Sequence, residues 1–196
     1  MVALLETLLT DVKSCALCAE ALPHGVRPVL QVSSTAKILI AGQAPGSKVH
    51  ATGIPFDDPS GDRLRSWMGV SRGTFYDPAK TAILPMGFCY PGTGKSGDLP
   101  PRLECAPKWR QPLLELMPKV KLTLVIGQYA VKWHLADTLE KNLTETVRNW
   151  LQYIDAGYLP LPHPSPRNNI WLKKNPWFES DVLPELRARI AVALTV

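Results

Sequence analysis

Four cysteines are the residues whose type and spacing point most directly to chemistry. Cys15 and Cys18 form a C-x-x-C pair, whereas Cys89 and Cys105 are separated by fifteen residues. Two thiolates at the short spacing reach one metal centre from a single turn, and four thiolates complete the shell of a [4Fe–4S] cluster or a structural Zn²⁺ ion. Zinc sites built from two pairs usually repeat the short spacing, so the wide second pair favours iron–sulfur. Zinc and four unligated thiols remain the alternatives.

A second candidate is the loop 163–168, His-Pro-Ser-Pro-Arg-Asn, which follows an apolar run. Its two prolines stiffen the backbone. A histidine held rigidly at the end of a strand can donate an aimed hydrogen bond to negative charge that develops during a reaction. The alternative is that His163 only ties down its own loop.

Three further segments carry chemistry-bearing residues. The loop 42–46, Gly-Gln-Ala-Pro-Gly, follows another apolar run, and Phe56 comes shortly after it, either as a stacking face or as part of the core. Asp57, Asp58 and Asp62 are general-base candidates or caps of the helix that follows. The segment 92–96, Gly-Thr-Gly-Lys-Ser, resembles the end of a phosphate loop, but the required earlier glycine is Cys89, so we expect a basic flexible loop.

The elements that must position these residues alternate between strands and helices. Short apolar runs predict strands at 36–42, 81–84, 122–127 and 158–162, and helical patterns fall at about 61–68, 107–117, 128–152 and 178–194. A further amphipathic helix is expected at the N-terminus. This alternation predicts an α/β fold with a parallel sheet flanked by helices. Such sheets bind ligands at the carboxyl ends of their strands, where the loops 42–46 and 163–168 both lie.

The composition is that of a globular protein. The chain has 196 residues, 45% of them hydrophobic and 20% charged, with a formal net charge of +5. We therefore expect one domain spanning residues 1–196. No run reaches the ~18 uncharged apolar residues of a membrane span, and the first residues lack the pattern of a signal peptide. We expect a cytoplasmic monomer whose cysteines are thiols or metal ligands before they are disulfides.

Read together, the motifs resemble those of the uracil-DNA glycosylase superfamily, particularly its iron–sulfur branch, family 4. The resemblance extends from Cys15 to about Trp177. It rests on the two cysteine pairs, the first motif Gly42–Gly46, the segment 53–56 (Gly-Ile-Pro-Phe) and the second motif 163–165 (His-Pro-Ser). Each motif is short, and their order and spacing together are specific.

The resemblance implies a three-layer α/β/α sandwich with a central four-stranded parallel sheet, and hydrolysis of the N-glycosidic bond of a base flipped out of DNA. His163 would donate a hydrogen bond to the leaving pyrimidine anion, and Gln43 would position the attacking water. Phe56 would stack on the base, and Arg167 would fill the gap in the duplex. The remaining residues implied are, for the base, Gly42, Ala44 and Asn168; for DNA, Pro45, Gly46, Ser165 and Pro166; and for a [4Fe–4S] cluster, Cys15, Cys18, Cys89 and Cys105.

Two positions depart from the family pattern. Pro85 stands where family 4 has the asparagine that reads the uracil edge, and Gln43 stands where a glutamate is usual. Asn168 or Asn169 is a possible substitute reader. The resemblance therefore leaves uracil, another deaminated base or no base at all as the expected substrate. The alternatives are a catalytically silent nucleic-acid-binding protein on the same scaffold and an iron–sulfur redox protein.

We also expect salt-dependent binding of DNA through basic side chains near the loop edge. These candidates are Lys48, Arg63, Arg65, Arg72, Lys95, Arg102, Arg167, Lys173 and Lys174.

Overall fold

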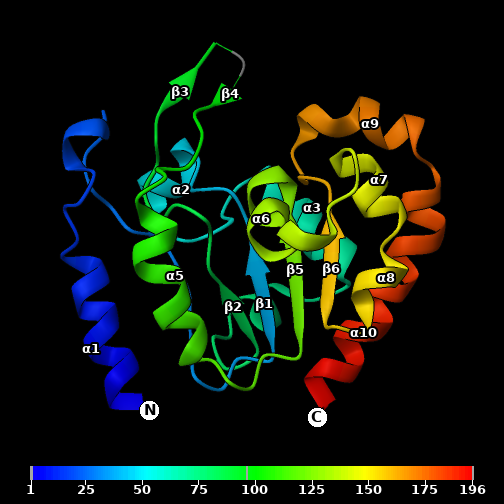
Figure 1. Ribbon diagram of the computed structural model, residues 1–196, viewed down its shortest axis with the longest axis horizontal. Coiled ribbons are helices and arrows are strands. Elements are labelled where there is room, and N and C mark those ends of the chain that lie inside the picture. The colour runs from blue at the N-terminus through cyan, green and yellow to red at the C-terminus, as the bar shows by residue number, and fades with distance from the viewer. Residues whose placement is uncertain (1, 96, 196) are drawn as a thin grey trace.

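The central sheet is formed by the apolar segments that the sequence predicts as strands. In the computed structural model, which describes residues 2–95 and 97–195, four parallel strands lie in the order β2-β1-β5-β6 (Figure 1). They are β1 (Ile38–Ala41), β2 (Thr81–Ile83), β5 (Leu122–Ile126) and β6 (Tyr158–Leu161). Almost all of their residues are buried, which explains why each strand reads as a continuous apolar run. The predicted α/β class and parallel sheet are confirmed.

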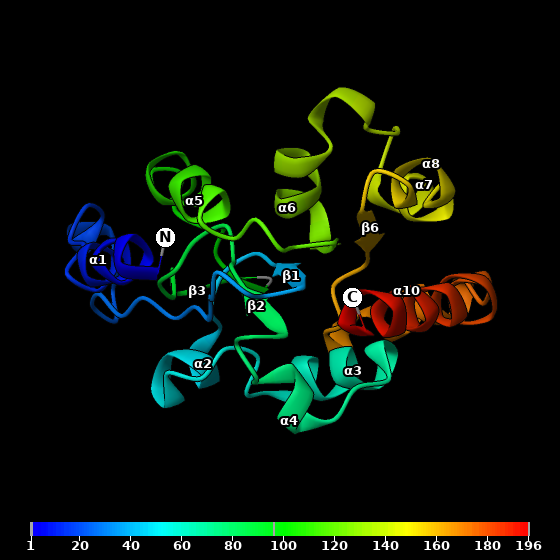
Figure 2. The same ribbon diagram turned by 90° about the horizontal axis from the view of Figure 1, so that it is seen from below.

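Helices cover both faces of the sheet and make the expected three-layer sandwich. Helices α5 to α8 lie over one face, and α3, α4 and α10 lie over the other (Figure 2). Helix α1 packs beside α5. The bounds of the helices are α1 (Val2–Lys13), α2 (Ser47–Thr52), α3 (Pro59–Met68), α4 (Arg72–Phe75), α5 (Cys105–Glu115), α6 (Gly127–His134), α7 (Leu143–Arg148), α8 (Leu151–Ile154), α9 (Asn169–Lys174) and α10 (Leu183–Thr195).

Alternate residues of each strand serve the two layers. Ile38 and Ile40 belong to the core cluster that contains residues of α3 and α10, whereas Leu39 belongs to the cluster formed with α1 and α5. Both faces of the sheet are therefore occupied by apolar packing. The carboxyl ends of the strands are left for the polar loops, which is where the candidate site residues were expected.

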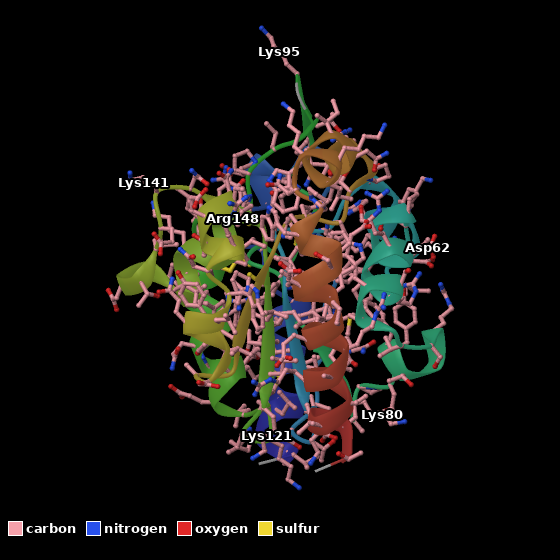
Figure 3. The ribbon with its side chains drawn as sticks, turned by 90° about the vertical axis from the view of Figure 1, so that its right-hand side faces the viewer. Asp62, Lys80, Lys95, Lys121, Lys141 and Arg148 are labelled. Carbon is pink, nitrogen blue, oxygen red and sulfur yellow. The ribbon has the colours of Figure 1, made fainter. Side chains whose placement is uncertain are left out.

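The segment 92–99 forms a hairpin in place of the expected flexible loop. Strand β3 (Thr93–Gly94) pairs antiparallel with β4 (Gly97–Asp98), and the N–H of Leu99 donates to the carbonyl of Gly92 at 2.8 Å. The hairpin projects beyond the carboxyl ends of the parallel strands, with Lys95 at its far end (Figure 3). The sequence missed it because each strand has only two residues.

The single helix predicted over 128–152 is wrong. Helix α6 ends at His134, and a new helix, α7, begins after Asn142, whose side chain accepts a hydrogen bond from the N–H of Glu145 at 3.0 Å. That cap starts a helix in a new direction. The helix predicted over 178–194 contains a π-helical turn at Phe178–Val182 before α10. Within residues 2–95 and 97–195, no helix has both the length and the apolarity to cross a membrane.

Candidate active site

A cleft of about 550 Å³ lies at the carboxyl edge of the sheet. All the residues to which the family resemblance gives a role in catalysis, base binding or DNA binding line it, so two loops far apart in the sequence meet there as expected. These residues are Gly42, Gln43, Ala44, Pro45, Gly46, Phe56, His163, Ser165, Pro166, Arg167 and Asn168.

His163 is held in one orientation by its own loop. The N–H of Ser165 donates to Nδ1 of His163 at 3.1 Å, and the side-chain amide of Asn168 donates to the His163 carbonyl at 2.7 Å. Because Nδ1 accepts a hydrogen bond from the backbone N–H of Ser165, the neutral ring carries its own proton on Nε2. Burial lowers the pKa of His163, although the charges of Asp58 and Asp98 act in the opposite direction. The ring is therefore a neutral hydrogen-bond donor at neutral pH.

Helix α3 braces this loop from outside the cleft. Arg63 donates one hydrogen bond to the carbonyl of Ser165 at 3.1 Å and another to the side chain of Asn169 at 2.8 Å. Asn169 is thereby engaged outside the residues that line the cleft, so it does not supply the missing base reader. Asn168 does line the cleft, but its amide nitrogen is engaged with the backbone of His163.

Backbone hydrogen bonds join the first loop to the end of β2. The N–H of Met86 donates to the carbonyl of Gly42 at 2.8 Å, and that of Gly87 donates to Gln43 at 2.9 Å. The side chain of Gln43 donates from Nε2 to the carbonyl of Leu99 at 3.2 Å. A Cβ at Gly42 would lie 3.4 Å from the ring of Phe56, which shows that this ring lies directly over the loop.

Phe56 sits in a backbone conformation that side chains rarely adopt, with φ of 55°. Three contacts hold it there. Gly61 packs so closely that a Cβ would fall 1.8 Å from the Phe56 carbonyl oxygen, and Arg65 donates to the same oxygen at 3.3 Å. The ring meets Phe75 edge to face at 6.2 Å between centroids. A strained residue that its surroundings hold in place is typical of functional sites.

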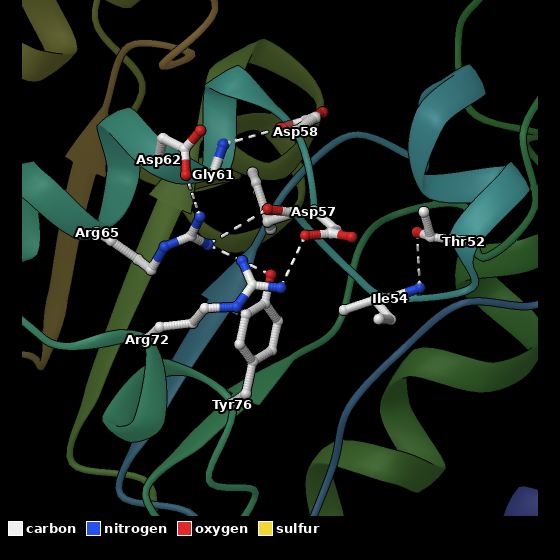
Figure 4. Close-up of polar contacts among 10 residues, drawn as sticks. Thr52, Ile54, Asp57, Asp58, Gly61, Asp62, Arg65, Arg72 and Tyr76 are labelled. Atoms are coloured by element: carbon white, nitrogen blue, oxygen red, sulfur yellow. Dashed lines mark hydrogen bonds and ion pairs between the residues drawn. The ribbon is translucent and has the colours of Figure 1, made fainter.

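The acids around Phe56 take structural partners. Asp58 caps α3 by accepting from the N–H of Gly61 at 2.8 Å, which is one of the two roles that the sequence left open for these acids. Asp62 pairs with Arg65, and Asp57 pairs with Arg72 at 2.9 Å (Figure 4). The expected DNA contact by Arg65 is therefore wrong, since Arg65 is buried among these partners.

Pro85 lies in the cleft and is supported from behind by a buried cation. The guanidinium of Arg110 donates to the Pro85 carbonyl at 2.9 Å and to the carbonyl of Leu84, and it contacts Nε2 of His134 at 2.6 Å. Burial lowers the pKa of Arg110 to about 10. It also lowers the pKa of His134 to about 3, with a further contribution from the Arg110 charge. This buried arginine fixes the backbone of the expected reader position.

The four cysteines surround one small apolar cavity between the N-terminal segment and the start of α5. Trp109 donates from Nε1 to Sγ of Cys15 at 3.3 Å, and the N–H of Phe88 donates to Sγ of Cys105 at 3.4 Å. Burial raises the pKa of Cys89 to about 11 and that of Cys105 to about 12. All four cysteines thus line the same cavity. In the described part of the chain, no three His, Cys, Asp or Glu side chains form a ready metal-binding group.

Two carboxylates also line the cleft. Asp58 is one of the three acids that the sequence left open between general base and helix cap, whereas Asp98, just beyond the flexible loop expected at 92–96, was not identified. The side chain of Arg167 rests on the same hairpin, because a Cβ at Gly97 would lie 2.6 Å from its Nη1 atom. No local sequence pattern predicts that Asp98 lies in the cleft, because the hairpin places it there.

A comparison with known protein families supports the resemblance that the motifs indicate. The model described as the uracil DNA glycosylase superfamily matches residues 30–187. The matched segment contains every residue that lines the cleft except Val29, together with Cys89 and Cys105, whereas Cys15 and Cys18 precede it.

Proposed function

The chain belongs to the uracil DNA glycosylase superfamily, and from that premise we propose that it releases uracil or a related deaminated base from DNA by hydrolysis of the N-glycosidic bond. The observation that carries the proposal is the convergence of both glycosylase motifs and Phe56 on one cleft at the carboxyl edge of the sheet. The match to the superfamily supports a DNA glycosylase in general. The proposal that the released base is uracil or a related deaminated base depends on the residues of the cleft.

The chemistry follows from the charge that appears when the bond breaks. The electron pair of the C1′–N bond leaves with the base, and the negative charge of a pyrimidine anion resides largely on its O2 atom. A hydrogen bond to that atom is stronger in the transition state than in the ground state, so it accelerates the reaction. His163 is suited to this role because its neutral ring presents the Nε2 proton and is fixed through Nδ1.

The other residues of the cleft bind and orient. Phe56, held against Gly42, offers a face on which a flipped base stacks. Gln43 holds the loop through Leu99 and orients water by its amide, which cannot take a proton. Arg167 is exposed at the mouth, where it can fill the gap that a flipped base leaves.

The proposed partner is DNA, bound at the end of the molecule that carries the strand termini. The hairpin with Lys95 and helix α9 with Lys173 and Lys174 both lie at this end (Figure 1). Contacts from these cations to phosphates give affinity that does not depend on sequence and that weakens with salt.

Pro85 favours a second candidate function, a catalytically silent DNA-binding protein on the same scaffold. Proline has no side-chain amide, and its carbonyl is engaged by Arg110, so this position offers no donor to the edge of uracil. Release of free base from duplexes carrying uracil, hypoxanthine or xanthine separates the two functions. A glycosylase releases at least one of these bases, whereas a silent protein binds all three duplexes and releases none.

We further propose that the chain belongs to the iron–sulfur branch and that Cys15, Cys18, Cys89 and Cys105 hold a [4Fe–4S] cluster. Their shared cavity supports this proposal. The cluster, when bound, ties the N-terminal segment to the start of α5, and its role in this proposal is structural.

Iron analysis tests the cluster. Protein purified without oxygen is expected to be brown and to contain about four iron atoms per chain, because four thiolates fill the shell of one cluster. Cys18→Ala is expected to lose iron and to lower the free energy of unfolding, whereas the nearby Ser14→Ala should change neither. Zinc alone, or no metal, in the wild-type protein would rule out the cluster.

A further inference from the structure

The hairpin brings a carboxylate into the cleft beside the first motif. Asp98 ends β4 and lines the cleft with His163. Its Oδ2 atom lies 3.3 Å from the position that a Cβ would take on Gly46, so the carboxylate rests against the backbone of the first loop. Any side chain at position 46 would crowd this oxygen, so glycine is the residue that lets the carboxylate lie so close to the backbone without a shift of either group.

Gln43 fixes the chain next to this carboxylate. Its Nε2 atom donates to the carbonyl of Leu99, the residue that follows Asp98, and the N–H of Leu99 closes the base of the hairpin on Gly92. The residue that stands in place of the family's usual glutamate is therefore an amide that positions the end of the hairpin. An amide cannot accept a proton from water, whereas the neighbouring Asp98 can.

The other carboxylate in the cleft, that of Asp58, is less free to bind the attacking water. Oδ1 of Asp58 accepts the N–H of Gly61 and caps α3, so moving this side chain would uncap the helix that holds Phe56 in place. Asp98, in contrast, lies at the end of β4 and lines the cleft, so moving its carboxylate would uncap no helix. Asp98 is also exposed, which keeps it in contact with the water that the reaction consumes.

We infer that Asp98 is a catalytic residue of this cleft, which binds the attacking water and stabilises the positive charge on the sugar, and that Gln43 positions it. This inference rests on the proposed glycosylase function. The C1′–N bond breaks and its electron pair goes to the base. The water oxygen then forms a bond to C1′ and passes one proton to the carboxylate of Asp98. That proton moves on through solvent to the base anion, so one water yields one free base and one abasic sugar.

Charge complementarity to the sugar can be measured without any base release. The probe is a duplex whose abasic site carries a cationic pyrrolidine ring, compared with the same duplex carrying a neutral tetrahydrofuran ring. Wild type is expected to prefer the cationic site by about two- to fivefold, the upper part of the range for one solvent-exposed ion pair. Asp98→Asn should abolish this preference, and Asp98→Glu should retain part of it.

The control is Asp155→Asn, which removes the same charge from a carboxylate that is 92% exposed and pairs weakly with Arg189 at 3.9 Å. It should keep the wild-type preference. On whichever base the wild type releases, Asp98→Asn should slow single-turnover release by about 10²-fold with DNA affinity nearly unchanged. Equal preference for the two duplexes in wild type, or an unchanged preference in Asp98→Asn, would overturn the inference. Both of these results are binding measurements and do not depend on base release. If the wild type released no base, that would count against the proposed function and not against this inference.

Discussion

Replacing His163 by alanine is expected to slow single-turnover base release by about 10²-fold or more, while DNA affinity stays nearly intact. The loss falls on the chemical step because the hydrogen bond from Nε2 gains strength only as the base becomes an anion. Rapid-quench measurement of free base, together with duplex binding by anisotropy, separates the two effects. The matched control is His24→Ala, since His24 is exposed and does not line the cleft.

The pH dependence of the same rate tests the state of the ring. Burial lowers the pKa of His163, so the neutral, donating ring persists as the pH falls through about 6.5, the ordinary value for histidine. Wild-type single-turnover release is therefore expected to change little through that pH region. A rate that rises on acidification with an apparent pKa near 6.5 would show that the charged ring is the active form. Equal rates for wild type and His163→Ala would remove His163 from the mechanism altogether.

Gly61→Ala is expected to have the largest effect on the framework of the cleft. The added Cβ would lie 1.8 Å from the carbonyl oxygen and 2.7 Å from the carbonyl carbon of Phe56, so the backbone must move. Overpacking of this kind typically costs about 1–3 kcal/mol. Because the displaced residue is Phe56, base release should fall more than tenfold as well. Urea unfolding and single-turnover release measure the two effects.

Gly73→Ala provides the matched control for that substitution. Gly73 lies in α4, and a Cβ there would meet only the Ser71 hydroxyl at 3.7 Å, an ordinary contact. This variant should match the wild type in both stability and rate. If Gly61→Ala were as stable and as active as Gly73→Ala, the close packing would not be what holds Phe56 in its strained conformation.

The sheet could be predicted from sequence because its strands are buried on both faces. Runs such as 122–127 stay apolar throughout, and the loops that leave their carboxyl ends must meet at one edge. That rule alone predicts that the loops 42–46 and 163–168 lie side by side. The helix boundaries were harder to predict, because the Asn142 cap interrupts a pattern that otherwise continues as a helix.

The parts of the site that sequence missed depend on contacts between distant segments. Arg110 donates to the Pro85 carbonyl, and Gln43 donates to the Leu99 carbonyl. Both acceptors are backbone atoms, which every residue has, so the sequence does not show which carbonyl each side chain contacts. Arg65 was expected among the basic side chains that bind DNA near the loop edge, yet it is buried where it bonds to the Phe56 carbonyl. The hairpin is too short for a periodic signal, so Asp98 could not be placed in the cleft.

The most direct test of the central claim is single-turnover release of free base from duplexes carrying uracil, hypoxanthine or xanthine, with excess protein whose metal content has been measured. We expect the wild type to release at least one of these bases and leave an abasic site, and to do so at least about 10²-fold faster than His163→Ala. Pro85→Asn, which restores a side-chain amide at the reader position, should raise release of uracil relative to the other two bases. No release of any base by either wild type or Pro85→Asn would contradict the account and leave the silent DNA-binding function in its place.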